Sequence, residues 1–229
     1  MATSRHYYTL IASLPHLPPH FDLRRTPISR PRLDARLRML TDQDRTLVVD
    51  IERFMNWSYQ STTETDASMR AHYDELIERV ADRSVLLEIL RFRASERTVM
   101  AALRRRKVGK PPPAPGEIFG IGNDVQMIKD NWDKPDFGLG RVYPWIDTVR
   151  RLIDNGEAAE LEKTLFGIIW HHLNKCALGQ HFSLESLIIY LCRWDIVDRY
   201  VSYEGEAGLE NFKLLVTETL GDTRDSLFA

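Results

Sequence analysis

Cysteine is scarce in this sequence, and long apolar runs are missing. Among 229 residues there are two cysteines, Cys176 and Cys192, too few for the disulfide framework that stabilises small secreted domains. The longest apolar run covers residues 187–192, whereas a membrane-spanning helix needs about 20 apolar residues. Residues 7–14 are too short, before Pro15, to be the apolar region of a signal peptide. We therefore expect a cytoplasmic protein that does not cross the membrane.

No segment alternates apolar and polar residues with a period of two, so the sequence offers no clear source of β-strands. Apolar residues instead recur every three to four positions through most of the chain, which is typical of amphipathic helices. The sequence thus predicts an all-α, bundle-like body of several helices. The predicted helices cover residues 41–57, 66–81, 84–107, 123–132, 144–156, 157–175, 183–203 and 207–220. Residues 7–14 are compatible with either a helical turn or a strand.

Proline is concentrated in residues 111–117, where four prolines exclude helix and favour an extended path. We interpret this segment as a linker between two helical halves, residues 1–110 and residues 118–229. Residues 1–110 carry 20 Lys and Arg against 14 Asp and Glu, whereas residues 111–229 carry 11 against 19. The net charge of −2 therefore hides a basic half and an acidic half, which suits halves that attract each other or that face two partners.

Recognised catalytic and metal-binding motifs are missing. His172 and Cys176 have the i, i+4 spacing of neighbours on one helix face, but neither CxxC nor HExxH occurs, and a structural zinc site needs four ligands. The glycines of residues 116–122 and 137–141 complete no phosphate-binding loop, and no serine lies in a GxSxG turn. We therefore expect no catalytic residue, metal or cofactor. An enzyme that uses His172, Cys176 or a carboxylate pair stays open as the weakest alternative.

The densest charge in the sequence is a basic run within residues 91–110. Cations in the last turn of a helix are stabilised by the helix dipole, which explains the end of this run better than its beginning. We interpret the run as a binding face for an acidic protein surface. Nucleic acid is disfavoured because the pI is about 6.4 and no nucleic-acid-binding motif is present. The predicted partner-binding residues are Arg91, Arg93, Arg97, Arg104, Arg105, Arg106 and Lys107.

Tryptophans are spread along the chain, close to one for each predicted helix or helix end. This distribution predicts that they fill contacts between packed helices, and an exposed one would instead be a candidate anchor for a partner. The five tryptophans are Trp57, Trp132, Trp145, Trp170 and Trp194.

Four segments resemble a bacterial family of helical proteins that is encoded among the components of V-type ATPases. They are residues 7–15 (YYTLIASLP), 93–109 (RASERTVMAALRRRKVG), 128–139 (IKDNWDKPDFGL) and 184–208, which include IYLCRWDIVDRY. The members stand where the component called C, or d in the eukaryotic enzyme, is expected. This C/d component is a socket between the membrane rotor ring and the central shaft.

The resemblance implies an all-α fold related to the C/d component of the V-type ATPase and a non-catalytic role between the central shaft and the membrane ring. It implies a location at the inner face of the cell membrane, through protein contacts only. The C/d proteins are longer than this chain, so the resemblance implies a reduced form. The alternative function is a free-standing helical adaptor or regulator that binds other proteins.

Overall fold

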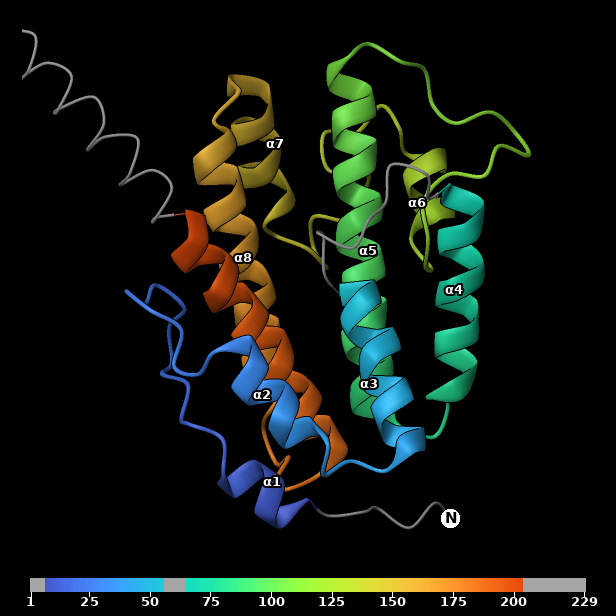
Figure 1. Cartoon of the computed structure of the whole chain (residues 1–229). Helices are drawn as coiled ribbons and strands as arrows, with labels where there is room; N and C mark the ends of the chain where they lie inside the picture. Colours follow the sequence, from blue (N-terminus) through green and yellow to red (C-terminus); the bar gives the residue numbers. More distant parts are fainter. Residues whose placement is uncertain (1–6, 56–64, 204–229) are drawn as a thin grey trace, which may run out of the picture.

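The computed structural model describes residues 7–55 and 65–203, and every regular element in these two ranges is a helix (Figure 1). The helices with complete bounds are α1 (Tyr8–Ala12), α2 (Arg30–Leu37), α3 (Asp42–Met55), α4 (Asp66–Arg79), α5 (Ser84–Lys107), α6 (Val125–Asp130), α7 (Ile146–Asn155) and α8 (Ala158–Cys176). A last helix covers residues 184–203 of the described chain. The all-α prediction is confirmed for the described residues.

Seven of the predicted helices have a counterpart in the structure, and residues 7–14 contain the short helix α1 rather than a strand. Helix α7 ends at Gly156, whose φ of 77° is the left-handed conformation that glycine adopts most easily. Helix α2 was not predicted from the sequence. It has Pro31 in its first turn and only two buried residues, Leu33 and Leu37. The predicted helix 207–220 lies outside the described residues.

Helix α5 is the central element of the fold. It has 24 residues and is therefore about 36 Å long at 1.5 Å per residue. Figure 1 shows it between α8 on one side and α4 and α6 on the other. It contacts α4, α6, α7 and α8, and so one helix is shared by most of the packing in the molecule.

Two hydrophobic clusters meet along α5. The larger cluster contains Leu86, Ile89, Leu90 and Ala94 of α5 together with residues of α1–α4, α8 and the last helix. The smaller cluster contains Val99, Met100, Ala102 and Leu103 of α5 together with residues of α6, α7 and α8. Both clusters draw on residues before and after the proline-rich segment 111–117, because α5 and α8 take part in each.

Thr98 fixes the chain that precedes α6 against α5. Its buried hydroxyl donates to the carbonyl of Ile121 at 2.7 Å and accepts from the N–H of Ile121 at 2.8 Å. The neighbouring Gly120 has a φ of 64°, and a Cβ there would lie 2.5 Å from Cγ2 of Thr98. Glycine is thus required for the close approach that positions Asp124 at the start of α6.

Replacing Thr98 with Val removes the hydroxyl and keeps the shape of the side chain. The N–H and C=O of Ile121 then lose their partner in a buried place, at about 1–3 kcal/mol for each unsatisfied group. We expect Thr98→Val to lower the free energy of unfolding by about 2–4 kcal/mol in urea titrations. Thr98→Ser keeps the hydroxyl and is the matched control. A Val variant as stable as the Ser variant would contradict this role of Thr98.

Candidate functional site

The seven predicted partner-binding residues all lie on α5, but the structure does not place them on one surface. Arg93 and Arg97 are buried, with 1% and 8% of their surface exposed. Arg105 and Arg106 are half-buried, and the other three are exposed. The binding face predicted from sequence is therefore divided between the interior and several sides of the helix.

Arg93 belongs to the core of the protein. Its guanidinium donates to the carboxylate of Glu96, which has no exposed surface, and its Nε donates to the carbonyl of Met55 at 3.2 Å. Burial lowers the pKa of Arg93, and the carboxylate of Glu96 opposes this effect. The ion pair lies within α5, and Arg93 joins α5 to the end of α3 through Met55. The interpretation of Arg93 as a contact for a partner is therefore corrected, because its side chain does not reach the surface.

Arg97 has a similar internal role one turn further along α5. Its guanidinium carbon lies 4.9 Å from the centroid of the Phe54 ring, and Nη1 lies 3.9 Å from the sulfur of Met69. A cation over an aromatic face is stabilised by the quadrupole of the ring. Arg97 thus packs α5 against α3 and α4, and its assignment to a partner-binding face is corrected for the same reason.

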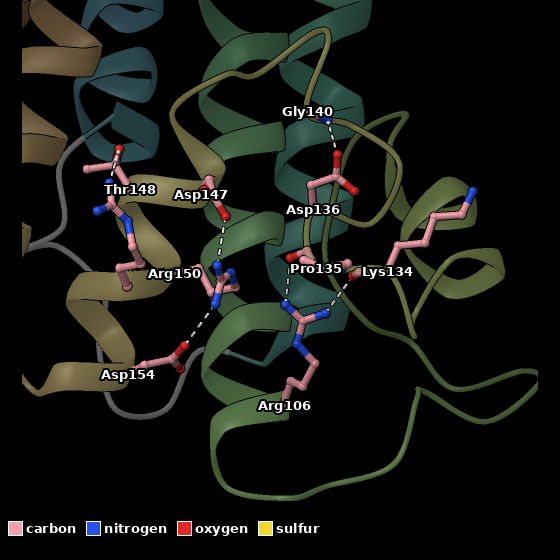
Figure 2. Close-up of polar contacts among 10 residues, drawn as sticks. Arg106, Lys134, Pro135, Asp136, Gly140, Asp147, Thr148, Arg150 and Asp154 are labelled. Atoms are coloured by element: carbon pink, nitrogen blue, oxygen red, sulfur yellow. Dashed lines mark hydrogen bonds and ion pairs between the residues drawn. The ribbon is translucent and has the colours of Figure 1, made fainter.

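The cations at the end of α5 bind neighbouring loops. Arg106 donates to the carbonyls of Lys134 and Pro135, each at 2.7 Å (Figure 2), and to the carbonyl of Trp132 at 3.2 Å. Its guanidinium carbon also lies 4.3 Å from the centroid of the Phe137 ring. Burial lowers the pKa of Arg106, and Arg150 acts in the same direction. These contacts fasten the loop after α6 to α5.

Two further cations of this run also have internal partners. Arg105 forms an ion pair with Glu117 and donates to the carbonyl of Pro111 at 2.8 Å. Lys107 donates to the carbonyl of Ile153 in α7. Figure 2 also shows Arg150, which lies between Asp147 and Asp154. Its guanidinium nitrogens are 2.8 and 3.3 Å from the carboxylate oxygens of these two residues. Most charge at this end of α5 therefore stabilises the fold.

Arg91 and Arg104 are exposed and form no hydrogen bond or ion pair within the part of the chain that the structure describes. They are 13 positions apart, which places them about 20 Å apart and on nearly opposite sides of a helix. They are the two predicted residues that keep a side chain available for a partner, but they do not form one patch.

Removing Arg93 or Glu96 alone takes the ion-pair partner away from the other buried charge. We expect Glu96→Gln to lower the free energy of unfolding by about 3–5 kcal/mol. The double variant Arg93→Met with Glu96→Leu removes both charges and is expected to be more stable than the single variant. Urea titration of each variant gives the comparison. A double variant that loses the sum of two single losses would contradict the pairing.

Arg106 and Arg104 lie two positions apart on α5, so the same substitution at each compares an arginine bound to loops with an exposed one. Arg106→Ala removes hydrogen bonds from a charged donor to three carbonyls, and we expect it to lower the free energy of unfolding by about 1.5–3 kcal/mol. Arg104→Ala changes an exposed side chain and is expected to alter stability by less than about 0.5 kcal/mol. Equal losses in thermal unfolding would contradict the assignment of Arg106 to the fold.

A groove of about 810 Å³ lies beside α5 and α8. Side chains at i, i+3, i+4 and i+7 lie on one face of a helix, and the lining follows this spacing. Helix α5 contributes Glu88, Arg91, Phe92 and Ser95. Helix α8 contributes Thr164, Gly167, Ile168, His171, His172 and Lys175. Residues 123–124 and 142–145 complete the groove, whose volume is typical of ligand-binding sites.

Aromatic rings form much of this groove. The ring of Phe92 stacks on His172, with 3.8 Å between centroids and 6° between planes. Phe92 also meets Tyr143 edge to face at 6.4 Å, and Tyr143 lies 5.6 Å from Trp145. Trp145 is partly buried and packs against the smaller hydrophobic cluster, so its ring contacts the core, as predicted, and also lines the groove.

The other described tryptophans are in the core. Trp132, Trp170 and Trp194 have 8%, 4% and 3% of their surface exposed, which confirms the predicted core role for these three. Trp57 lies outside the described residues.

Asp124 is the acidic centre of the groove. One of its oxygens, Oδ2, accepts hydrogen bonds from the hydroxyl of Ser95 and, at 2.9 Å, from that of Tyr143. Burial raises the pKa of Tyr143 to about 12, the hydrogen bond with Ser95 opposes this rise, and the carboxylates of Asp124 and Glu88 add to it. The phenol therefore stays protonated at neutral pH and donates to Asp124.

His172 lines the groove and lies beside Cys176, whose sulfur is 3.5 Å from Nε2 of the imidazole. Burial lowers the pKa of His172, so the ring is neutral at pH 7. Burial also raises the pKa of Cys176 to about 11, so the thiol is a poor nucleophile at neutral pH. Within residues 7–55 and 65–203, no three His, Cys, Asp or Glu side chains gather as a metal site would require.

A second, smaller cavity of about 40 Å³ lies beside Arg93, Cys192 and Asp195. It is large enough for one or two water molecules rather than an organic ligand. Burial raises the pKa of Asp195 to about 6 and also raises the pKa of the Cys192 thiol. We therefore regard the groove, and not this cavity, as the candidate functional site.

Residues 7–55 and 65–203 thus form an all-helical body with an aromatic, acid-containing groove beside two long helices. A family model described as "Protein of unknown function (DUF2764)" matches residues 65–222, and the chain belongs to this family. The matched region contains the helices α4–α8 and the whole groove. No curated protein and no solved structure matches the chain.

Proposed function

We propose that this protein is a non-catalytic, C/d-like component of a bacterial V-type ATPase that links the central shaft to the membrane rotor ring. The specific assignment comes from the four segments of the sequence that resemble a family encoded with such ATPases. Two of them lie near the centre of the fold: residues 93–109 belong mostly to α5, and residues 128–139 form the end of α6 and the loop after it. Members of that family are helical, and the described chain is all-α.

The observation that supports a linking role is the continuity of α5 through both hydrophobic clusters. A component that transmits torque between two neighbours needs a body that does not hinge between its contact surfaces. Here the last turn of α5 is held by the loops and α7 through Arg106 and Lys107. Its middle is fastened to α3 through the buried Arg93. This arrangement suits a rigid connection.

Contact with the membrane would be made through protein neighbours. Among the described residues, no helix combines the length and the apolar character needed to cross a bilayer. The opposite charges of residues 1–110 and 111–229 suit contacts with two different neighbours. Arg91 and Arg104, the two predicted partner-binding residues that are exposed and have no described partner, are the proposed contacts with acidic neighbours.

The second candidate function is a free-standing adaptor or regulator that binds other proteins. The groove beside α5 and α8 favours it, because a half-buried Trp145 and several other aromatic rings line a hollow of ligand-binding size. An adaptor of this kind would use the groove whether or not an ATPase is present.

Capture from native membranes tests the first proposal. We expect the tagged protein to bring down V-type ATPase components, and Arg91→Glu with Arg104→Glu to reduce their yield at least about tenfold, equivalent to about 1.4 kcal/mol. The matched control is Arg32→Glu with Arg38→Glu, which makes the same charge change at exposed positions in α2 and directly after it. Its yield should equal that of the unmodified protein.

Two results would count against the proposal in different ways. Equal yields from both double variants would remove Arg91 and Arg104 from the contact. Absence of ATPase components from the capture with the unmodified protein would reject the V-type ATPase assignment itself.

A further inference from the structure

The groove beside α5 and α8 has a polarity that identifies the kind of group it can hold. We propose that it binds one positively charged side chain, an arginine or lysine on an extended segment of a partner protein, with Asp124 as the ion-pair acceptor and Tyr143 and Trp145 as the aromatic wall. This inference concerns the groove alone and does not depend on the V-type ATPase assignment.

Asp124 provides the negative charge of the proposed site. It is half-buried, and its Oδ2 is held in place by Ser95 of α5 and by Tyr143 from the segment before α7. Hydrogen bonds from two different segments fix the direction of the carboxylate, and Oδ1 has no hydrogen bond within the part of the chain that the structure describes. A carboxylate fixed in this way is a preformed acceptor for a guanidinium or ammonium group.

Tyr143 and Trp145 provide the second part of the site. Their ring centroids lie 5.6 Å apart, and both rings are partly exposed in the groove. The negative face of an aromatic ring attracts a cation within about 6 Å of its centroid. Aromatic faces beside a carboxylate therefore favour a cation over a neutral or anionic group.

Two cations, Arg91 and Lys175, and a second carboxylate, Glu88, also line the groove. All three are exposed, so water and salt screen their charges more effectively than the half-buried charge of Asp124. The two cations set a limit on the ligand, because repulsion from them disfavours a densely basic segment. The site therefore suits a single cationic side chain with uncharged neighbours.

The length of the groove indicates a segment of chain rather than a small molecule. Thr164 and Lys175 both line it, and these positions lie about 16 Å apart along a helix. An extended chain of about five residues covers this distance. The matching stripes on α5 and α8 give such a segment two parallel walls.

The test uses the full chain and two blocked pentapeptides, acetyl-Gly-Gly-Arg-Gly-Gly-amide and the same peptide with citrulline in place of arginine. Citrulline has nearly the shape of arginine but no charge. We expect the arginine peptide to shift the NMR signals of Ser95, Asp124, Tyr143 and the indole N–H of Trp145. The citrulline peptide should bind at least about tenfold more weakly.

Substitutions of an acidic and of a basic residue of the groove should change the affinity for the arginine peptide in opposite directions. Asp124→Asn keeps an oxygen for Ser95 and Tyr143 and should weaken binding of the arginine peptide at least about tenfold. Arg91→Ala removes a repulsive charge and should strengthen binding about two- to threefold. Asp130→Asn is the matched control, because Asp130 is an exposed acid of α6 that pairs with Gln126, and it should leave binding unchanged.

Trp145→Leu is a second variant that leaves the hydrogen bonds of Asp124 intact and should also weaken binding.

Three outcomes would overturn the inference. One is equal binding of the arginine and citrulline peptides. Another is unchanged binding after both Asp124→Asn and Trp145→Leu. The third is the absence of shifts at the groove with about 10 mM arginine peptide, a concentration at which even millimolar affinity is visible.

Discussion

The buried ion pair of Arg93 and Glu96 lies in the part of α5 where the two hydrophobic clusters meet. Neither charge has solvent to stabilise it, so each depends on the other, and the guanidinium of Arg93 also donates to the carbonyl of Met55. A buried pair of this kind contributes little net stability compared with apolar residues, but removing one of its members is costly. Both members lie on α5, three positions apart, so the pair is joined to α3 by the hydrogen bond from Nε of Arg93 to the carbonyl of Met55.

The basic run of α5 has its physical explanation mainly within the chain. Backbone carbonyls at helix ends and in loops need hydrogen-bond donors. Arg105, Arg106 and Lys107 donate to backbone carbonyls of three different segments. Cations at this end are also favoured by the helix dipole. What remains for a partner is the exposed charge of Arg91 and Arg104, together with the groove, whose central acid carries the opposite charge.

Helical spacing was sufficient to predict most of the fold, including both ends of α5, because long amphipathic helices have a strong periodic signal. Helix α2 was missed because two buried leucines in eight residues give almost no such signal. The burial of Arg93 could have been predicted from the sequence, because it lies three and four positions after Leu90 and Ile89 on the apolar face. The hydrogen bonds of Asp124 with Tyr143 and Ser95 could not be predicted, because they depend on how two loops return to α5.

We propose that this helical body works as a connecting part of a rotary ATPase. A photoreactive amino acid introduced in place of the exposed Arg104 tests this directly in intact cells, because it reports the neighbour that lies within a few ångströms. We expect cross-links to a component of the central shaft or of the membrane ring of the V-type ATPase. Cross-links that form reproducibly with other proteins and never with an ATPase component would contradict the claim.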